Sequence, residues 1–212
     1  MTDNYYILQD GEQAGPFTGY ELMEMGLDVD TMLLPAMSSK WQKASDLPEF
    51  NPYFEAKGIY FPTLDNLATF WWRLLAYAID CVVLYLLINI LVMLLVAFGP
   101  VENLLTKIQK FDTKDPINQL TLNLIGFALS VVYNTIFEAT SMRGSIGKKI
   151  CKLAVVDADG RRLGIGQAFL RNLYKFISGA ALCLGYLNVF WDEHRQGWHD
   201  QWARTYVIIK GL

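Results

Sequence analysis

The stretch FWWRLLAYAIDCVVLYLLINILVMLLVAF, residues 70 to 98, decides the fold class of this chain. After Arg73, Asp80 is the only charged residue in it. A helix over the last 25 residues would be roughly 37 Å long, enough to cross a hydrocarbon core about 30 Å thick. We therefore expect a membrane-spanning helix here, with Trp71 and Trp72 at the level of the interfacial aromatic belt.

The composition agrees with a membrane protein. The 212 residues are 53% hydrophobic and 18% charged, whereas soluble domains are usually about a quarter charged. The net charge of −3, without a basic arm, argues against nucleic-acid binding. No basic segment followed by an apolar core begins the chain, so we expect no cleavable signal peptide and a cytoplasmic N-terminus.

A second span is expected from Leu120 to Phe137. The loop before it has three basic residues, Lys107, Lys110 and Lys114, balanced by acidic ones. The segment after it has six: Arg143, Lys148, Lys149, Lys152, Arg161 and Arg162. Because cytoplasmic loops are enriched in lysine and arginine, this segment is expected in the cytoplasm after two crossings.

The last part of the chain combines two strand-like segments with a third apolar run. "KLAVVD" and "TYVII" are typical of strands and are natural partners. Between them, "GIGQAFLRNLYKF" predicts a helix at the membrane surface, with Arg171 and Lys175 on its polar side. Residues 176 to 191 are apolar but contain Gly179 and Gly185. Since the strands can pair only on one side, we expect a re-entrant or interfacial segment and a cytoplasmic C-terminus.

Charged side chains in the spans need partners, because each costs up to about 2.5–3.5 kcal/mol at the centre of a membrane helix. Arg73 and Asp80 share a helix face but are separated by about 10.5 Å along the axis. Glu138, at the end of the second span, would lie at a similar depth to Arg73 in an antiparallel pair. We therefore predict a buried Arg73–Glu138 ion pair.

Asp80 is then left deeper in the membrane without an obvious basic partner. Such a carboxyl group is protonated, binds a cation, or meets a hydroxyl, an amide or a second charge. Intramembrane ionisable groups usually have a role, which favours a functional site. The alternative is that Asp80 locks helix packing through hydrogen bonds.

Residues 1 to 50 have the pattern of a small soluble α+β unit. "YYILQ" predicts a strand, "DGEQAG" a turn, and "TMLLPA" a second strand. Thr18 and Glu21 form the capping-box pattern at the start of a short helix that ends at Gly26. "KWQKASDLPEF" closes the unit, and residues 51 to 69, with Pro52, Gly58 and Pro62, are expected to form a linker or membrane-surface segment.

The order of "YYILQDGEQAGPF", helix, "DTMLLPA" and "KWQKASDLPEF" resembles the bacterial GYF-type domain of the second GYF class. The Gly-Tyr-Phe tripeptide itself is absent, and "GPF" stands there. The resemblance implies an aromatic surface that binds proline-rich peptides, for which polyproline II segments are suited because they lose little entropy. We expect Tyr6, Phe17, Tyr20 and Trp41 on that surface; the alternative is that these aromatics form the domain's core.

The remainder of the chain resembles the RDD family of bacterial membrane proteins, which is named for one arginine and two aspartates. The resemblance rests on an arginine followed seven residues later by an aspartate, on "GSIGKKICKLAVVDADGRRLGIGQAFLRNLYKF", and on "RQGWHDQWARTYVII". Arg73 and Asp80 match the first two residues of the name by position, and Asp200 the third. What the family resemblance implies is a multi-span protein with a role often taken to be transport.

Several other patterns do not indicate a site. "GSIGKKI" lacks the spacing of a phosphate-binding P-loop and is better suited to contact anionic headgroups. His194 and His199 lie among acidic residues, but no helix frame places them around a metal, so Asp200 is expected to cap or pair locally. Cys81 and Cys183 are expected to be buried small hydrophobes. We expect neither a cofactor nor enzymatic activity, because no nucleophile and base share a location.

The expected architecture is therefore a small α+β GYF-like domain (1–50), a linker (51–69) and an α-helical membrane domain (70–212) with two spans, a third re-entrant or short span and a small cytoplasmic β-hairpin. We expect a bacterial inner-membrane protein that transports or exchanges a small cation or proton through Arg73, Asp80, Glu138 and Asp200. Since two or three spans cannot enclose a pathway, a homo-oligomer is expected. The alternative is a membrane-bound adaptor for proline-rich partners.

Overall fold

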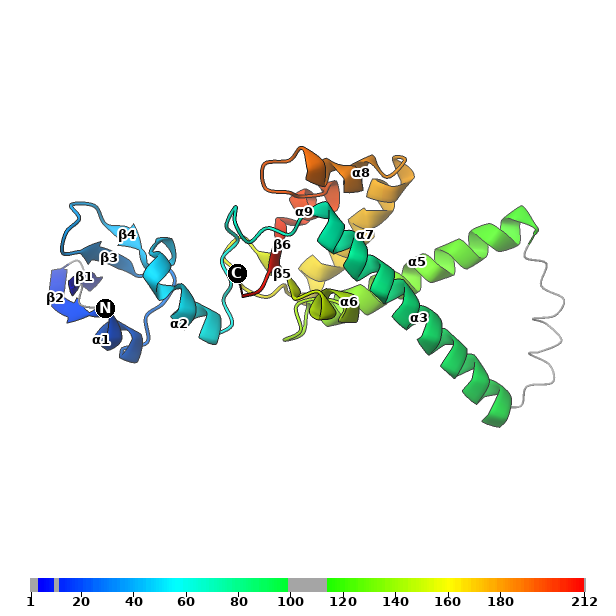
Figure 1. The fold of residues 1–212 in the computed structure, drawn as a ribbon, viewed down its shortest axis with the longest axis horizontal. Coiled ribbons are helices and arrows are strands. Elements are labelled where there is room, and N and C mark those ends of the chain that lie inside the picture. Colours follow the sequence, from blue (N-terminus) through cyan, green and yellow to red (C-terminus); the bar gives the residue numbers. More distant parts are fainter. Residues whose placement is uncertain (1–3, 10–11, 99–113, 212) are drawn as a thin grey trace. The chain divides into compact units, whose positions relative to one another are not determined.

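The structure, a computed structural model, describes residues 4–9, 12–98 and 114–211. The chain divides into two compact units (Figure 1). The N-terminal unit extends to Phe61 and includes Asp159–Arg161, and the second unit comprises the rest. The expected balance of charges in the loop between the two spans falls largely on residues 99–113, outside the described residues.

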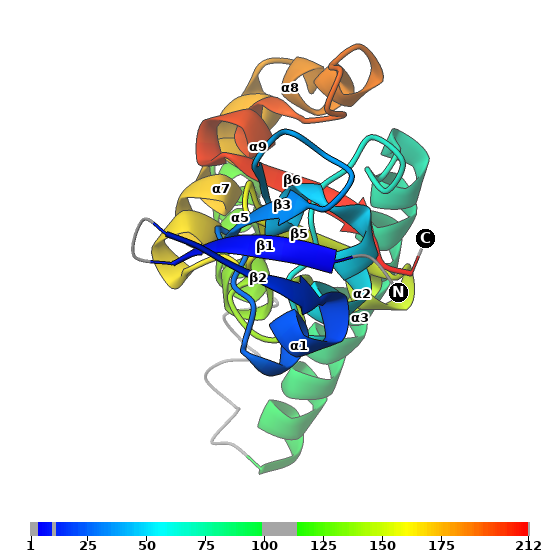
Figure 2. The same ribbon diagram turned by 90° about the vertical axis from the view of Figure 1, so that its left-hand side faces the viewer.

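The N-terminal unit is built on a four-stranded antiparallel sheet in the order β2-β1-β3-β4. Figure 2 shows β1 between β2 and β3. The strands are β1 (Asn4–Gln9), β2 (Glu12–Thr18), β3 (Met32–Pro35) and β4 (Gln42–Lys43). The predicted turn was too long: β2 begins already at Glu12, because its residues pair with β1 from Gln9 onward.

Short helices complete this unit. Helix α1 (Gly19–Glu24) has the predicted capping box, since the Thr18 hydroxyl accepts from the Glu21 N–H and the Glu21 carboxylate accepts from the Thr18 N–H. The 3₁₀ turns η1 (Ala44–Asp46) and η2 (Pro48–Phe50) lead into α2 (Asn51–Ala56).

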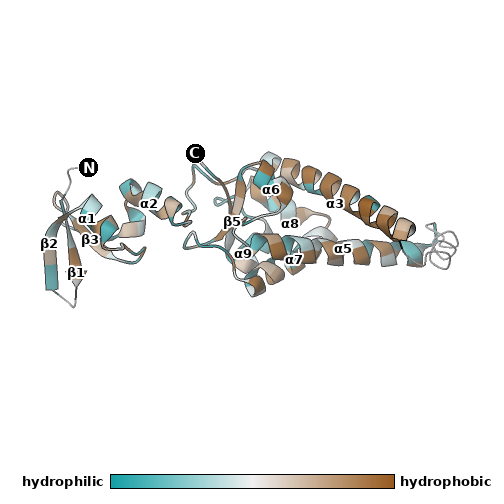
Figure 3. Ribbon diagram, turned by 90° about the horizontal axis from the view of Figure 1, so that it is seen from below, coloured by the Kyte–Doolittle hydropathy of each residue, from teal (hydrophilic) through white to brown (hydrophobic). Residues whose placement is uncertain are grey.

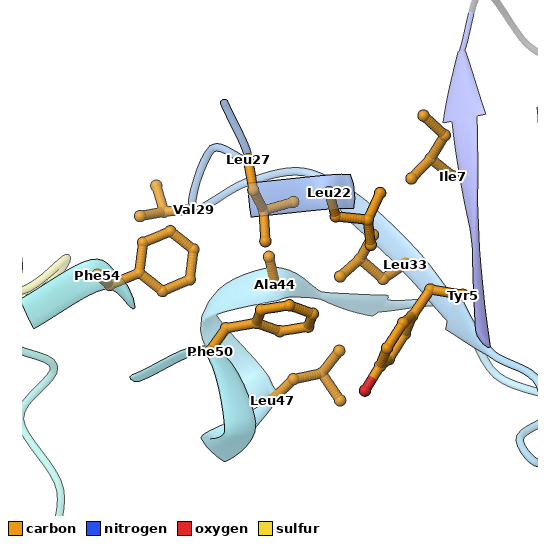
Figure 4. Packing of buried hydrophobic residues seen from close by; sticks show 10 residues of the cluster. All are labelled: Tyr5, Ile7, Leu22, Leu27, Val29, Leu33, Ala44, Leu47, Phe50 and Phe54. Atoms are coloured by element: carbon orange, nitrogen blue, oxygen red, sulfur yellow. The ribbon is translucent and has the colours of Figure 1, made fainter. Parts of the chain in front are cut away.

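The core of the N-terminal unit is apolar throughout (Figure 4). Phe50 and Leu33 are fully buried in it, and the Tyr5 ring packs 5.3 Å from that of Phe50. Phe54 of α2 also belongs to this core. Residues 51–61, which the sequence pattern assigned to a linker, therefore belong to the domain, because Phe54 is needed to fill its interior.

The second unit contains two helices long and apolar enough to cross a membrane, α3 (Phe70–Phe98) and α5 (Pro116–Glu138). Both predicted spans are thus present as helices. Only 6% of the most apolar window of α3 is buried, and Figure 3 shows apolar residues along its length. Such a surface is suited to lipid.

Helices α6 (Ile146–Ile150) and α7 (Ile165–Ala180) pack against the two long helices, α6 on α3 and α7 on α5. After α7 the chain bends by 112° into α8 (Leu184–Leu187) and the 3₁₀ turn η3 (Asn188–Phe190). Gly185 permits this close return, since a Cβ there would lie 2.6 Å from the side chain of Ser178.

Strand β5 (Leu153–Asp157) pairs antiparallel with β6 (Thr205–Ile209), which follows helix α9 (Trp198–Ala203). These are the two segments whose pairing the sequence indicated. The pair covers a small core that includes Leu153, Val155 and Val207, with Ala76 of α3. The strands are neighbours in space although the whole α7–α9 segment separates them along the chain.

Two sequence expectations for this unit are wrong. Cys81 and Cys183 are exposed rather than buried, because they lie on outward faces of apolar segments. Helix α7 does not turn its polar side outward, as a helix lying on the membrane surface would: Arg171 is only 2% exposed, and the apolar side chains Phe169, Leu173 and Phe176 point outward. The helix is therefore polar toward the protein and apolar toward its surroundings.

Candidate intramembrane polar site

Arg171 lies at the centre of a buried ion-pair network. Its Nη1 donates to Glu138 Oε1 at 2.6 Å, and its Nε and Nη2 donate to Asp200 Oδ1 at 2.9 and 2.6 Å. The Thr205 hydroxyl accepts a further bond from Nε at 3.1 Å. Because the guanidinium group is a rigid fork of donors, one side chain joins α5, α7, α9 and the start of β6.

Asp200 accepts a second arginine on its other oxygen. Arg73 Nη1 donates to Oδ2 at 2.5 Å, while Arg73 Nη2 donates to the carbonyl oxygen of Arg195 at 2.6 Å. Asp200 also caps its own helix by accepting from the Gly197 N–H. Burial alone would raise the pKa of Asp200, but Arg171 and Arg73 hold it well below its usual value.

Glu138 is the second carboxylate of the network. Besides Arg171 it binds the Lys148 ammonium group, and its Oε2 accepts from Asn172 Nδ2 at 2.9 Å. Lys175 Nζ lies farther away, 4.0 Å from Oε1. Burial lowers the pKa of Lys148, an effect opposed by the charge of Glu138.

The predicted Arg73–Glu138 ion pair is wrong, although both residues belong to one network. Depth in the membrane was the only basis for pairing them. The structure inserts α9 beside the start of α3, so that Asp200 reaches Arg73, and Glu138 is bound from α6 and α7 instead. Arg171 connects the two carboxylates.

Asp80 lies apart in a separate hydrogen-bond cluster. Its Oδ1 accepts from the Tyr133 hydroxyl at 2.9 Å and from the Gly147 N–H at 2.8 Å, and its Oδ2 accepts from the Ser145 hydroxyl at 2.5 Å. The sequence left several kinds of partner open for this carboxyl group, and the structure shows that Asp80 binds the hydroxyl groups of Tyr133 and Ser145. They tie α3 to α5 and to the first turn of α6.

Gly147 makes this arrangement possible. A Cβ added there would lie 2.1 Å from the Ala76 carbonyl oxygen and 2.9 Å from the Asp80 carboxyl carbon. Only glycine lets α6 approach α3 closely enough for its backbone N–H to reach Asp80. Gly147 is therefore a positioning residue that the sequence analysis did not single out.

His199 was also not predicted to join the site. Its Nδ1 lies 3.3 Å from the Ser178 hydroxyl and its Nε2 lies 3.5 Å from Asp200 Oδ1. Burial lowers the pKa of His199 to about 3, although Asp200 opposes this, so the ring is neutral at physiological pH. Arg171 and Lys175, four residues apart and the two charged residues of this amphipathic helix, were the signal that could have located the network.

The four aromatics expected on a peptide-binding surface divide into two groups, and none of them is buried in the core. Tyr6 pairs across the sheet with Leu34, on the face opposite the core, and Trp41 directly precedes β4. Phe17 packs against the edge of the core and lines a cavity of about 320 Å³ with Glu21, Glu24 and Met25. Tyr20 is 68% exposed on α1.

Within the described residues, no group of three or more His, Cys, Asp or Glu side chains is arranged to hold a metal ion. What the buried network does is mechanical. It joins α3, α5, α6, α7 and α9 through charge-assisted hydrogen bonds in a unit whose outer surface is apolar. These features define a class of protein: an α-helical membrane protein with a small domain at its N-terminus.

The comparisons with known proteins give the family. Residues 67–204 match the model of the RDD family, and residues 5–50 match GYF domain 2. The chain belongs to the RDD family and has an N-terminal GYF-type domain.

Three relatives are similar in sequence to parts of this chain. An uncharacterized protein of Bacillus subtilis (strain 168), YxaI, is 30% identical over 155 residues, which cover 69% of this chain and all of that protein. The proline-rich antigen of Mycobacterium leprae (strain TN) is 28% identical over 151 residues, 66% of this chain and 60% of that protein. A proline-rich antigen homolog of Mycobacterium tuberculosis (strain CDC 1551 / Oshkosh) is 29% identical over 85 residues, 40% and 35% of the two chains. No solved structure matches this chain.

Proposed function

We propose that this protein is a non-catalytic membrane adaptor whose GYF-type domain recruits a partner through a proline-rich segment. The observation that carries the proposal is the outer face of the N-terminal sheet. Tyr6 and Leu34 are paired there, since their neighbours Tyr5 and Leu33 face the core. Gln42 pairs with Leu33, so Trp41 falls on the outer face beside Leu34.

The spacing of the two rings suits the proposed ligand. Tyr6 and Trp41 are two strand positions apart, roughly 9.6 Å at about 4.8 Å per strand. One turn of a polyproline II helix rises about 9.3 Å. Prolines one turn apart can therefore stack on the two rings, with Leu34 beneath the residues between them.

The net charge of the N-terminal unit indicates which kind of proline-rich segment it would bind. Residues 1–61 contain ten acidic and three basic side chains, a net charge of −7, while the rest of the chain has eleven acidic and fifteen basic ones. Electrostatic complementarity favours a proline-rich segment with lysine or arginine. Two relatives bear the name proline-rich antigen, so a proline-rich segment on a protein with this membrane domain is one candidate ligand.

The test is binding of synthetic peptides to the full chain in neutral detergent. A proline- and arginine-rich peptide should bind, a peptide with alanine in place of proline should not, and Trp41→Ala should weaken binding by about tenfold or more. Tyr20→Ala, on α1, is the matched control and should leave affinity unchanged. Equal binding of the proline and alanine peptides would refute the proposal. Loss of binding in Tyr20→Ala alone would move the site to the α1 side.

The adaptor requires a defined orientation in the bacterial inner membrane. Strands β5 and β6 pair, so the α7–α9 segment must return to the side from which it starts. This supports two crossings and a re-entrant third segment, with both termini in the cytoplasm, where the basic residues after α5 favour retention. A reporter active only in the cytoplasm should work at the C-terminus and fail when inserted between Phe98 and Lys114.

A second candidate function is exchange of a small cation or proton through the intramembrane polar residues, in a homo-oligomer. The support is Asp80, whose carboxylate is bound by the hydroxyls of Tyr133 and Ser145. Such groups can pass a proton between them. Ion flux into proteoliposomes should then fall in Asp80→Asn and persist when residues 1–61 are removed, with membrane abundance measured for both. Flux that is absent from the intact protein would exclude this candidate without affecting the adaptor.

A further inference from the structure

The buried ion-pair network has more cations than anions. Four cationic side chains, Arg73, Lys148, Arg171 and Lys175, face two carboxylates, Glu138 and Asp200. Their side-chain exposures are at most 20%. Asp80, held by neutral donors, lies in the separate cluster, and Asp192 and Arg195 add one charge of each sign nearby. An uncompensated buried charge is costly, so an additional anion would stabilise this site.

Lys175 is the cationic side chain of this network that lacks a close carboxylate partner. Arg73 and Arg171 lie 2.5–2.6 Å from carboxylate oxygens, and Lys148 binds Glu138 directly, whereas Lys175 Nζ is 4.0 Å from Glu138. Lys175 donates to the neutral Oδ1 of Asn172 at 2.5 Å. An ammonium group has three donors, so Lys175 can bind a further acceptor.

A second observation points to the same place. The Thr135 hydroxyl is buried, with the residue only 7% exposed, and has no hydrogen-bond partner among the described residues. Along α5, Thr135 lies between Phe127 and Glu138 and on the same side of the helix. Both of these residues contact α7: Glu138 binds Asn172, and the ring of Phe127 contacts that of Phe176. Thr135 therefore faces the part of α7 that contains Lys175. Buried hydroxyls without partners are rare, and a bound acceptor would satisfy this one.

The position of the network along the membrane helices identifies the kind of anion. Arg73 is three residues from the start of α3, and Glu138 is the last residue of α5. In a bilayer crossed by these two helices, the start of α3 and the end of α5 would be level with the lipid headgroups. The outer face of α7 beside Lys175 is apolar, with Leu173 and Phe176 exposed by 41% and 52%, and can pack against acyl chains.

We propose that Lys175, Lys148 and Thr135 bind the phosphate group of an anionic phospholipid whose acyl chains lie along the outer face of α7. A phosphate diester has one negative charge and several acceptor oxygens, so it offsets part of the excess positive charge and accepts from both the ammonium groups and the hydroxyl. The lipid would thereby hold α7 against α5. This site is independent of the peptide-binding face and of Asp80.

The test is thermal unfolding of the full chain in nanodiscs of phosphatidylcholine, with and without phosphatidylglycerol. Phosphatidylglycerol should raise the melting temperature of the wild type by roughly 2–5 °C. Lys175→Gln should abolish this rise and, because it removes an uncompensated charge, should not lower the melting temperature in phosphatidylcholine alone. Thr135→Val, a near-isosteric change, should at least halve the rise. Lys149→Gln is the control, since it removes the same charge from an exposed position on α6.

Two results would overturn the proposal. An equal loss of the lipid effect in Lys149→Gln and Lys175→Gln would mean general surface attraction, and an unchanged effect in both Lys175→Gln and Thr135→Val would place the lipid elsewhere. A further measurement adds millimolar inorganic phosphate to the protein in nanodiscs of phosphatidylcholine alone. If it reproduces the full rise in the wild type and not in Lys175→Gln, the site binds free phosphate and the lipid assignment is wrong.

Discussion

The interiors of the two units of this protein differ in the side chains that they contain. In the N-terminal unit, apolar side chains such as Phe50, Phe54 and Leu33 fill the interior. The membrane unit has a small apolar core beside β5 and β6, but Arg171, Glu138 and Asp200 are also buried in it, and many large apolar residues of α3 and α7 are exposed. The difference follows from the solvent. Water drives apolar groups together, whereas lipid provides no such force between helices, so polar contacts and close packing hold them.

Helix α7 shows the contrast within a single element. Arg171, Asn172 and Ser178 are buried on one side, and Phe169 and Phe176 are exposed on the other. In a soluble domain this pattern would place the helix with its apolar side inward. The charged residues therefore face inward here because the alternative would be contact with hydrocarbon.

The largest effect is expected from breaking the ionic interior. Arg171→Gln leaves Glu138 and Asp200 without their shared partner and should lower the free energy of unfolding by about 3–5 kcal/mol. Denaturant unfolding in detergent, with the yield of membrane-inserted protein, measures this. Arg204→Gln, at an exposed position in the same unit, should change little. A loss below about 1 kcal/mol in Arg171→Gln would mean that the network contributes little to stability.

Phe50→Ala tests the apolar core of the N-terminal unit in the way that Arg171→Gln tests the ionic network of the membrane unit. Phe50 is fully buried, and its truncation should cost about 3–5 kcal/mol through lost burial and the cavity left behind. Amide hydrogen exchange of the N-terminal unit in the intact chain would report it. Phe98→Ala removes the same atoms from an 86% exposed position on α3 and should leave that exchange unchanged. Equal effects would contradict the contrast between the two units.

Acid should destabilise the membrane unit through His199. Its pKa is about 3 in the folded protein and 6.5 when unperturbed, so the unfolded chain binds a proton first as pH falls. Stability is complete above pH 6.5 and is lost toward pH 3, by about 2 kcal/mol at pH 5. His199→Gln should flatten the pH dependence of melting, while His194→Gln, at an exposed histidine, should not. The stabilisation that Asp200 provides through its lowered pKa is fully present above its ordinary value of 3.8 and is lost only below that pH.

The smallest effect is expected at the capping box of α1. Thr18→Ala removes the hydroxyl that accepts from the Glu21 N–H and should cost about 1 kcal/mol. Hydrogen exchange of residues 19–24 would increase while the membrane unit keeps its exchange rates. Ser39→Ala, an exposed serine in the same unit, is the control. Faster exchange in the membrane unit would show that the two units unfold together.

The sequence predicted which residues belong to the site better than it predicted which of them contact one another. Arg73, Glu138 and Asp200 do belong to one network, and Asp80 does lie in a polar setting. The pairing of Arg73 with Glu138 failed because residues at the same depth can face different neighbours. Lys148 and Gly147 were read only as parts of a basic loop, since nothing in their local pattern indicates burial.

The sequence by itself determined the two spans, the capped helix α1, the strands β1 and β3 and the pairing of β5 with β6, because these depend on residue periodicity, helix caps and length relative to a bilayer. Only the tertiary structure decided that Asp200 binds Arg73, that Arg171 joins two carboxylates, and that α7 faces inward with its charges. These contacts join residues as many as 127 positions apart. Their energies depend on burial and on mutual orientation, which no local pattern of residues contains.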